Sequence, residues 1–137
     1  MKELKGDLLS IKTAARKLFF RSPEYSFMQI VYEKEQATKG PVKYMIRGPN
    51  IDWGVITLAP GESMTPHFHK EVEETFYILE GVTTILVKDK NQEIEAPAGT
   101  AIRLEPTEQH GLKNKGSIHT KMVFIKHIYR PVDKVDC

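Results

Sequence analysis

The chain of 137 residues has the length of a single domain, which buries roughly two-thirds of its unfolded surface. Its 20 Lys and Arg residues are nearly balanced by 18 Asp and Glu residues, with no long block of either sign, which argues against a basic surface for nucleic acid. The lone cysteine, Cys137, excludes an internal disulfide, and no apolar run reaches the ~20 residues of a membrane helix, so we expect a cytoplasmic protein without a membrane partner.

The N-terminal 40 residues have a different pattern from the rest of the chain. Asp7 is a suitable cap for an amphipathic helix over residues 7–20, although two short strands fit the same segment. Residues 27–32 predict a strand and residues 33–41 a loop. With no linker or second core in view, we expect residues 1–40 to be an arm that packs on the barrel or on a partner subunit.

From Pro41 onward the chain consists of short β-rich runs separated by Gly, Pro and Asn turns. Such regular spacing predicts an all-β sandwich or barrel, assigned here to residues 41–131 with a C-terminal tail at 132–137. The expected strands are VKYMIR, WGVITL, SMTPHFH, TFYIL, VTTILV, QEIEA, TAIRL, HGLK and IHTKMVFIKHIY.

Two histidines one residue apart, His67 and His69, are the first candidate metal ligands. On a strand, residues i and i+2 point to the same face, whereas on a helix the two side chains would diverge. Two imidazoles on one face are a suitable start for a site that binds Zn, Fe, Mn, Ni or Cu.

Three glutamates follow the histidines, and side-chain parity alone does not choose among them. If the strand continued straight, Glu71 and Glu73 would share the face of the histidines. If residues 70–73 form a hairpin connection, an antiparallel neighbour would instead bring Glu74 back beside His69.

The spacing of this segment resembles the first motif of the cupin superfamily. Gly61 is followed after five residues by His67-Phe68-His69, after four more by Glu74, and after six more by Gly81. The resemblance selects Glu74, because a ligand at Glu73 would break the count to Gly81.

A second segment is similar to the second cupin motif, in which a histidine follows a Gly/Pro turn. His110 lies after Gly99 and is followed four residues later by Asn114. Residues 105–107 (Glu-Pro-Thr) depart from the pattern, because the proline comes one place late and Thr107 replaces the usual glycine. The resemblance covers roughly residues 42–129.

The resemblance implies a cupin-type double-stranded β-helix, or jelly-roll barrel, with an N-terminal arm. It also implies one divalent transition metal per chain (Fe, Mn, Ni or Zn), bound by His67, His69, Glu74 and His110. Cupins include dioxygenases, lyases and isomerases, so we expect a small metal-dependent enzyme acting on an oxygen-rich small metabolite, with metal-bound water as the base. The alternative is a non-catalytic sensor that binds a sugar or another small molecule. Homodimers are common among small cupins, and a homodimer is expected here.

Three further residues are candidate substrate contacts. Arg47 and Arg103 lie at or inside strand segments, where an inward-facing guanidinium would need a carboxylate partner from the protein or the substrate. Phe76 belongs to the predicted barrel lining. By contrast, His119 and His127 have no companion carboxylate and are expected to be structural or surface groups.

Overall fold

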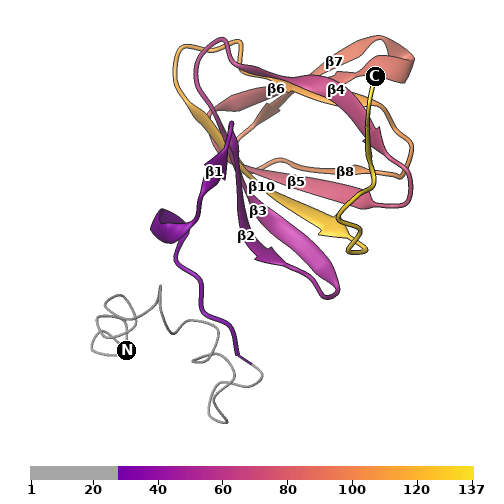
Figure 1. Ribbon diagram of the computed structural model, residues 1–137. Helices are drawn as coiled ribbons and strands as arrows, with labels where there is room; N and C mark the ends of the chain where they lie inside the picture. The colour runs from indigo at the N-terminus through magenta and orange to yellow at the C-terminus, as the bar shows by residue number, and fades with distance from the viewer. Residues whose placement is uncertain (1–27) are drawn as a thin grey trace. The chain divides into compact units, whose positions relative to one another are not determined.

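The computed structural model describes residues 28–137, and the compact unit within it is Tyr32–Cys137. Two antiparallel sheets face one another and form a barrel (Figure 1). One sheet has the strand order β1-β2-β3-β10-β5-β8, and the other has the order β11-β4-β9-β6-β7. The expectation of an all-β jelly-roll barrel is therefore confirmed.

The strands of the six-stranded sheet are β1 (Thr38–Lys39), β2 (Val42–Arg47), β3 (Ile51–Leu58), β5 (Glu73–Glu80), β8 (Ala101–Leu104) and β10 (Thr120–His127). Those of the five-stranded sheet are β4 (Ser63–His69), β6 (Val82–Val87), β7 (Gln92–Pro97), β9 (His110–Lys113) and β11 (Lys134–Asp136). Two short 3-10 helices, η2 (Glu33–Glu35) and η3 (Lys88–Lys90), complete the regular structure of the described residues.

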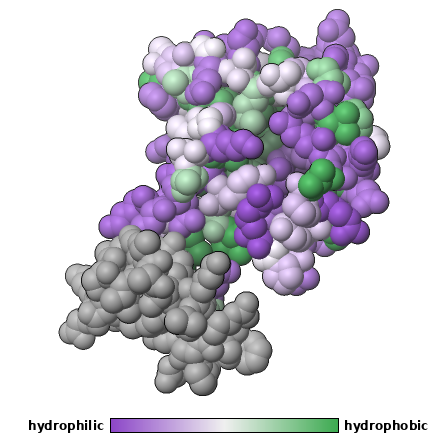
Figure 2. All heavy atoms as spheres, viewed as in Figure 1, coloured by the Kyte–Doolittle hydropathy of each residue, from purple (hydrophilic) through white to green (hydrophobic). Residues whose placement is uncertain are grey.

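The core lies between the two sheets, because apolar residues alternate along the strands and their inward face is buried. The six-stranded sheet contributes Phe76 and Phe124, and the five-stranded sheet contributes Ile85 and Leu112; each is at most 1% exposed. Each such side chain contributes roughly 1.5–3 kcal/mol when fully buried. The face in Figure 2 is mostly hydrophilic with separate hydrophobic spots, as expected for this partition.

Close packing inside the six-stranded sheet requires a glycine at position 54. A Cβ atom there would lie 2.1 Å from the backbone oxygen of Lys43 and 2.9 Å from the ring of Phe124. Gly54 therefore lets β2 and Phe124 approach β3 closely.

Three segments outside the central strands differ from the sequence prediction. Residues 33–41, expected as a loop, include η2 and β1. The strand expected over residues 27–32 is wrong for the described part of that segment, since residues 28–32 carry no strand. Residues 132–137, expected as a tail, include β11, which pairs antiparallel with β4. The helix expected over residues 7–20 lies outside the described residues.

In the described residues, no helix has the length and hydrophobicity required to cross a membrane.

Candidate metal centre

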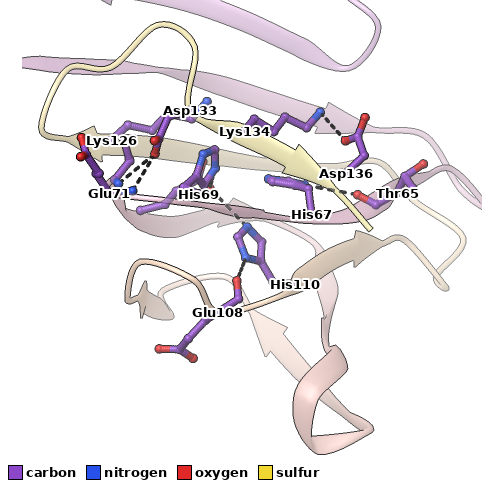
Figure 3. Close-up of polar contacts among 12 residues, drawn as sticks. Thr65, His67, His69, Glu71, Glu108, His110, Lys126, Asp133, Lys134 and Asp136 are labelled. Carbon is purple, nitrogen blue, oxygen red and sulfur yellow. Dashed lines mark hydrogen bonds and ion pairs between the residues drawn. The ribbon is translucent and has the colours of Figure 1, made fainter.

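Four side chains from both sheets meet at one point inside the barrel. β4 places His67 and His69 on its inner face, and β9 pairs with β4 so that His110 lies opposite His67. Figure 3 shows the three imidazoles gathered together from these two strands. The ring centres are 5.0 Å apart for His67 and His69 and 4.5 Å apart for His67 and His110. Glu74, on β5, approaches them from the opposite sheet.

Glu74 is the glutamate that faces the histidines. Its Oε1 atom lies 3.1 Å from Nε2 of His69 and 3.3 Å from Nε2 of His110. Glu73 points the other way, with its side chain 37% exposed and paired with an arginine. Glu71 lies in the connection before β5 and pairs with Arg130 at the surface. The strand β5 begins at Glu73, so Glu74 is the first residue of that strand on its inner face.

The four groups have the donor geometry of a metal site. One ligand atom from each of His67, His69, Glu74 and His110 can be chosen so that all four lie within 4.8 Å of one another. All four residues are buried, with exposures between 1% and 7%. Zn–N and Zn–O bonds of about 2.0–2.2 Å place ligand atoms about 3–4 Å apart around one ion, so a small contraction would seat a cation. The cluster could therefore hold a metal.

Backbone carbonyls fix the orientation of two imidazoles. His110 donates its Nδ1–H to the carbonyl of Glu108 at 2.9 Å, and His67 Nδ1 lies 3.3 Å from the carbonyl of Thr65. A carbonyl only accepts, so these contacts place the proton on Nδ1 and leave Nε2 as the electron-pair donor. Nε2 of His110 is buried, and its 3.3 Å contact with Oε1 of Glu74 does not have hydrogen-bond geometry, so a cation between the two atoms would satisfy both.

The pKa values of two members of the cluster are shifted from their usual range. Burial lowers the pKa of His67 to about 4, with the nearby His110 adding to the effect, so this imidazole is neutral at pH 7. Burial alone would raise the pKa of Glu74, but its contacts with His110 and His69 outweigh burial and hold the pKa well below its usual value. A neutral imidazole and an ionised carboxylate are the forms that bind metals.

A cavity of about 440 Å³ opens onto this centre. His67, His69 and Glu74 lie in its wall, and so do Arg47 and Phe76, two of the residues expected to contact a substrate. Arg103, the third residue expected to contact a substrate, does not line this cavity. Its side chain is 65% exposed and pairs with Glu73 and Glu105, because it occupies an outward position of β8.

Sequence reasoning missed several polar residues in the cavity wall, among them Tyr44 and Lys126. The signal for Lys126 was present, because it follows Met122 and Phe124 at two-residue intervals and so shares their inward face. The other two histidines, His119 and His127, are exposed.

The turn before His110 carries the departure from the cupin pattern. Thr107 has a φ of 74°, a left-handed conformation that glycine adopts without strain and a β-branched residue rarely adopts. Its backbone N–H donates to the carbonyl of His69 at 2.7 Å. This hydrogen bond joins the turn that leads into His110 to the end of β4. It offsets part of the backbone strain at Thr107.

Comparison with known proteins places these observations in a family. Residues 54–126 match the sequence model of the family described as Cupin domain. The tetracenomycin polyketide synthase protein TcmJ of Streptomyces glaucescens is 31% identical over 71 residues, which are 52% of this chain and 46% of that protein. The chain thus spans about half the length of this curated relative.

Solved structures share the fold. A conserved protein with a double-stranded β-helix domain from Klebsiella pneumoniae gives a TM-score of 0.69 at 16% identity, over 80% of this chain and 96% of that one. The polyketide cyclase RemF from Streptomyces resistomycificus gives 0.67 at 20% identity, over 80% of this chain and 85% of that one. At these identities the likeness concerns the fold alone.

The strain at Thr107 predicts that Thr107→Gly stabilises the protein by about 0.5–1 kcal/mol. Relief of a left-handed backbone is worth about 1–2 kcal/mol, and the added freedom of glycine in the unfolded chain offsets about 0.5–1 kcal/mol. Denaturant unfolding measures the change. Thr57→Gly, in an exposed position of β3, is the control and should destabilise. If Thr107→Gly destabilises as much as this control, the strain assignment is wrong.

The lowered pKa of His67 predicts that metal-stripped protein loses stability as the pH falls from 7 to 5. The unfolded imidazole takes up a proton near pH 6.5 and the folded one only near pH 4, so unfolding gains protons in this window. The expected loss from this residue is about 1–2 kcal/mol by that linkage.

Urea unfolding at several pH values checks this prediction. His67→Gln should flatten the dependence, whereas His119→Gln, at an exposed position, should leave it unchanged. Equal slopes in wild type and His67→Gln would contradict it.

Proposed function

The chain belongs to the cupin domain family, and on that premise we propose that it is a metal-dependent enzyme. His67, His69, Glu74 and His110 would together hold one divalent transition metal. The observation that carries the proposal is the buried cluster itself, with four donor groups within 4.8 Å of one another beside a cavity of about 440 Å³. Burying three imidazoles and a carboxylate at one point is costly unless they have a binding partner, so such a cluster is not expected in a purely structural barrel.

The four ligand residues determine the charge and the chemistry of the metal centre. Three neutral imidazoles and one carboxylate leave one net positive charge on a divalent ion, which favours oxygen ligands of the substrate. When bound, the metal supplies a Lewis acid that polarises a carbonyl or acidifies a coordinated hydroxyl. Backbone carbonyls hold His67 and His110 by their Nδ1 atoms, and Phe76 and Leu112 form an apolar wall beside the centre. Fe, Mn, Ni and Zn all suit these ligands.

We propose a carbonyl-activating reaction of the lyase or isomerase type on a small oxygen-rich metabolite. Two relatives support this choice by their names, since RemF is a polyketide cyclase and TcmJ is a polyketide synthase protein. The cavity supports it as well, because Phe76 and Phe124 provide an apolar wall beside the polar centre. Oxygenase chemistry uses the same ligand set, so oxygen uptake is recorded in every assay.

The proposal predicts about one transition metal per chain in purified protein, measured by elemental analysis. His67→Ala combined with His69→Ala should remove it. Metal at ~100 times its dissociation constant adds ~2.7 kcal/mol of stability, which raises the melting temperature by roughly ten degrees. A chelator should reverse this rise. Metal-loaded protein is then screened for turnover of β-diketones and enediols.

Two neighbouring glutamates supply the matched control for this prediction. Glu74→Gln should release most of the metal and abolish turnover, whereas Glu73→Gln, at an outward position, should retain both. Metal retained by Glu74→Gln and lost by Glu73→Gln would refute the assigned ligand set. Purified wild-type protein without metal, and unable to take it up, would refute the function.

A further inference from the structure

A row of charged residues with alternating sign crosses the inner face of the six-stranded sheet. Arg47 on β2 is in register with Asp52 on β3, Asp52 with Lys126 on β10, and Lys126 with Glu74 on β5. Residues directly opposite in antiparallel strands have Cβ atoms about 4.5–5.5 Å apart. All four residues lie in the wall of the cavity beside the metal centre. The row therefore forms one charged layer next to the metal ligands.

Three members of the row have charged partners. Arg47 donates to Asp52 through Nη2 at 3.1 Å and Nε at 3.4 Å, and Asp52 is 2% exposed. Glu74 contacts His69 and His110 in the metal centre. The charges of Arg47 and Asp52 thus neutralise each other, and the carboxylate of Glu74 contacts the imidazoles.

Lys126 is the exception, because its ammonium has no carboxylate in ion-pair contact among residues 28–137. Its hydrogen bond goes to the phenolic oxygen of Tyr44, at 3.0 Å. An ammonium has three donors, so this contact leaves donors that face the cavity. The neighbouring carboxylate of Glu74 attracts this charge without pairing with it directly, and an anionic group of a bound ligand would give the ammonium a direct partner.

The neighbours of Lys126 hold its side chain in place. The Nζ atom lies 5.4 Å from the ring centres of both Tyr44 and Phe124, a distance at which the aromatic faces attract a cation. Tyr44 is itself fixed by an edge contact with Phe124, with ring centres 5.2 Å apart, and by the guanidinium of Arg47, 4.0 Å from its ring centre. Lys126 is therefore a positioned cation and not a mobile surface lysine.

The whole cavity favours an anion with an apolar body. Five basic residues line it (Lys39, Arg47, Lys126, Arg130 and Lys134) against three acidic ones (Asp52, Glu74 and Asp133). Arg47, Arg130 and Lys134 have carboxylate partners, so Lys39 and Lys126 are the basic wall residues without an ion pair among residues 28–137. Asp133 is occupied by the backbone N–H groups of residues 71 and 72, at 3.0 Å each. The apolar part of the wall is formed by Ile56, Met64, Phe76, Leu112 and Phe124. Positive charge and flat apolar surface thus occur in one cavity.

We propose that Lys126, positioned by Tyr44, is the anion-recognition residue of this cavity. The ligand class is a small organic anion, a carboxylate or enolate on a planar apolar body. Lys126 holds the negative group while another oxygen of the ligand faces the metal centre. Only the metal-side contact rests on the proposed function, because the contact with Lys126 requires no metal.

Benzoate and its neutral analogue benzamide test this proposal as probes in a ligand-observed NMR titration of the purified full chain. Lys126→Met keeps the length of the side chain and removes the charge, so it should weaken benzoate about tenfold and change benzamide less than twofold. Lys121→Met is the matched control on the same strand. Lys121 pairs with Glu33 and lies outside the cavity wall, so both affinities should stay unchanged. Should Lys126→Met fail to fold, Lys126→Gln replaces it.

The outcomes separate this inference from the proposed function. A Lys126 variant that keeps the preference for benzoate over benzamide, or a wild type that shows none, overturns the inference. Metal content is measured in every variant and should be equal in Lys126→Met and wild type. If wild-type protein holds no metal, the proposed function fails. The same titration on this metal-free protein still decides whether Lys126 recognises the anion.

Discussion

The site depends on a cluster of one carboxylate and three imidazoles in the interior of the barrel. Glu74 belongs to one sheet and the three histidines to the other, so the two sheets are joined at this point by polar groups rather than by apolar packing. Such a contact is costly to bury unless every donor and acceptor is satisfied. The Nδ1 contacts to carbonyls satisfy one side of His67 and His110, and the orphaned Nε2 of His110 marks where a cation completes the arrangement.

The barrel interior is divided between apolar packing and polar function. Ile78, Ile85 and Met122 fill the closed part of the core, while the metal centre and the charged row lie where the interior opens to the cavity. The closed, apolar part of the interior therefore provides most of the stability, and the part that opens to the cavity provides the chemistry. This division explains how one fold can carry different reactions, because the open part can change its side chains without disturbing the packed part.

Much of the fold and of the site could be predicted from local pattern. Period-two alternation and Gly/Pro turns located most strands, and parity placed His67 and His69 together. Parity could not choose the glutamate, because the choice depends on where the chain turns back into the opposite sheet. The partner of β11 is 65 residues away from it in sequence, at Lys134↔His69, so no local signal indicated that pairing. The outward position of Arg103 could not be read from the sequence, because it depends on the register of β8 with β5.

X-ray absorption at the K edge of the bound metal would identify the ligands themselves. We expect three imidazole nitrogens and at least one oxygen at about 2.0–2.2 Å from a single ion. A spectrum with fewer than two imidazoles, or with sulfur from Cys137 as a ligand, would contradict this expectation.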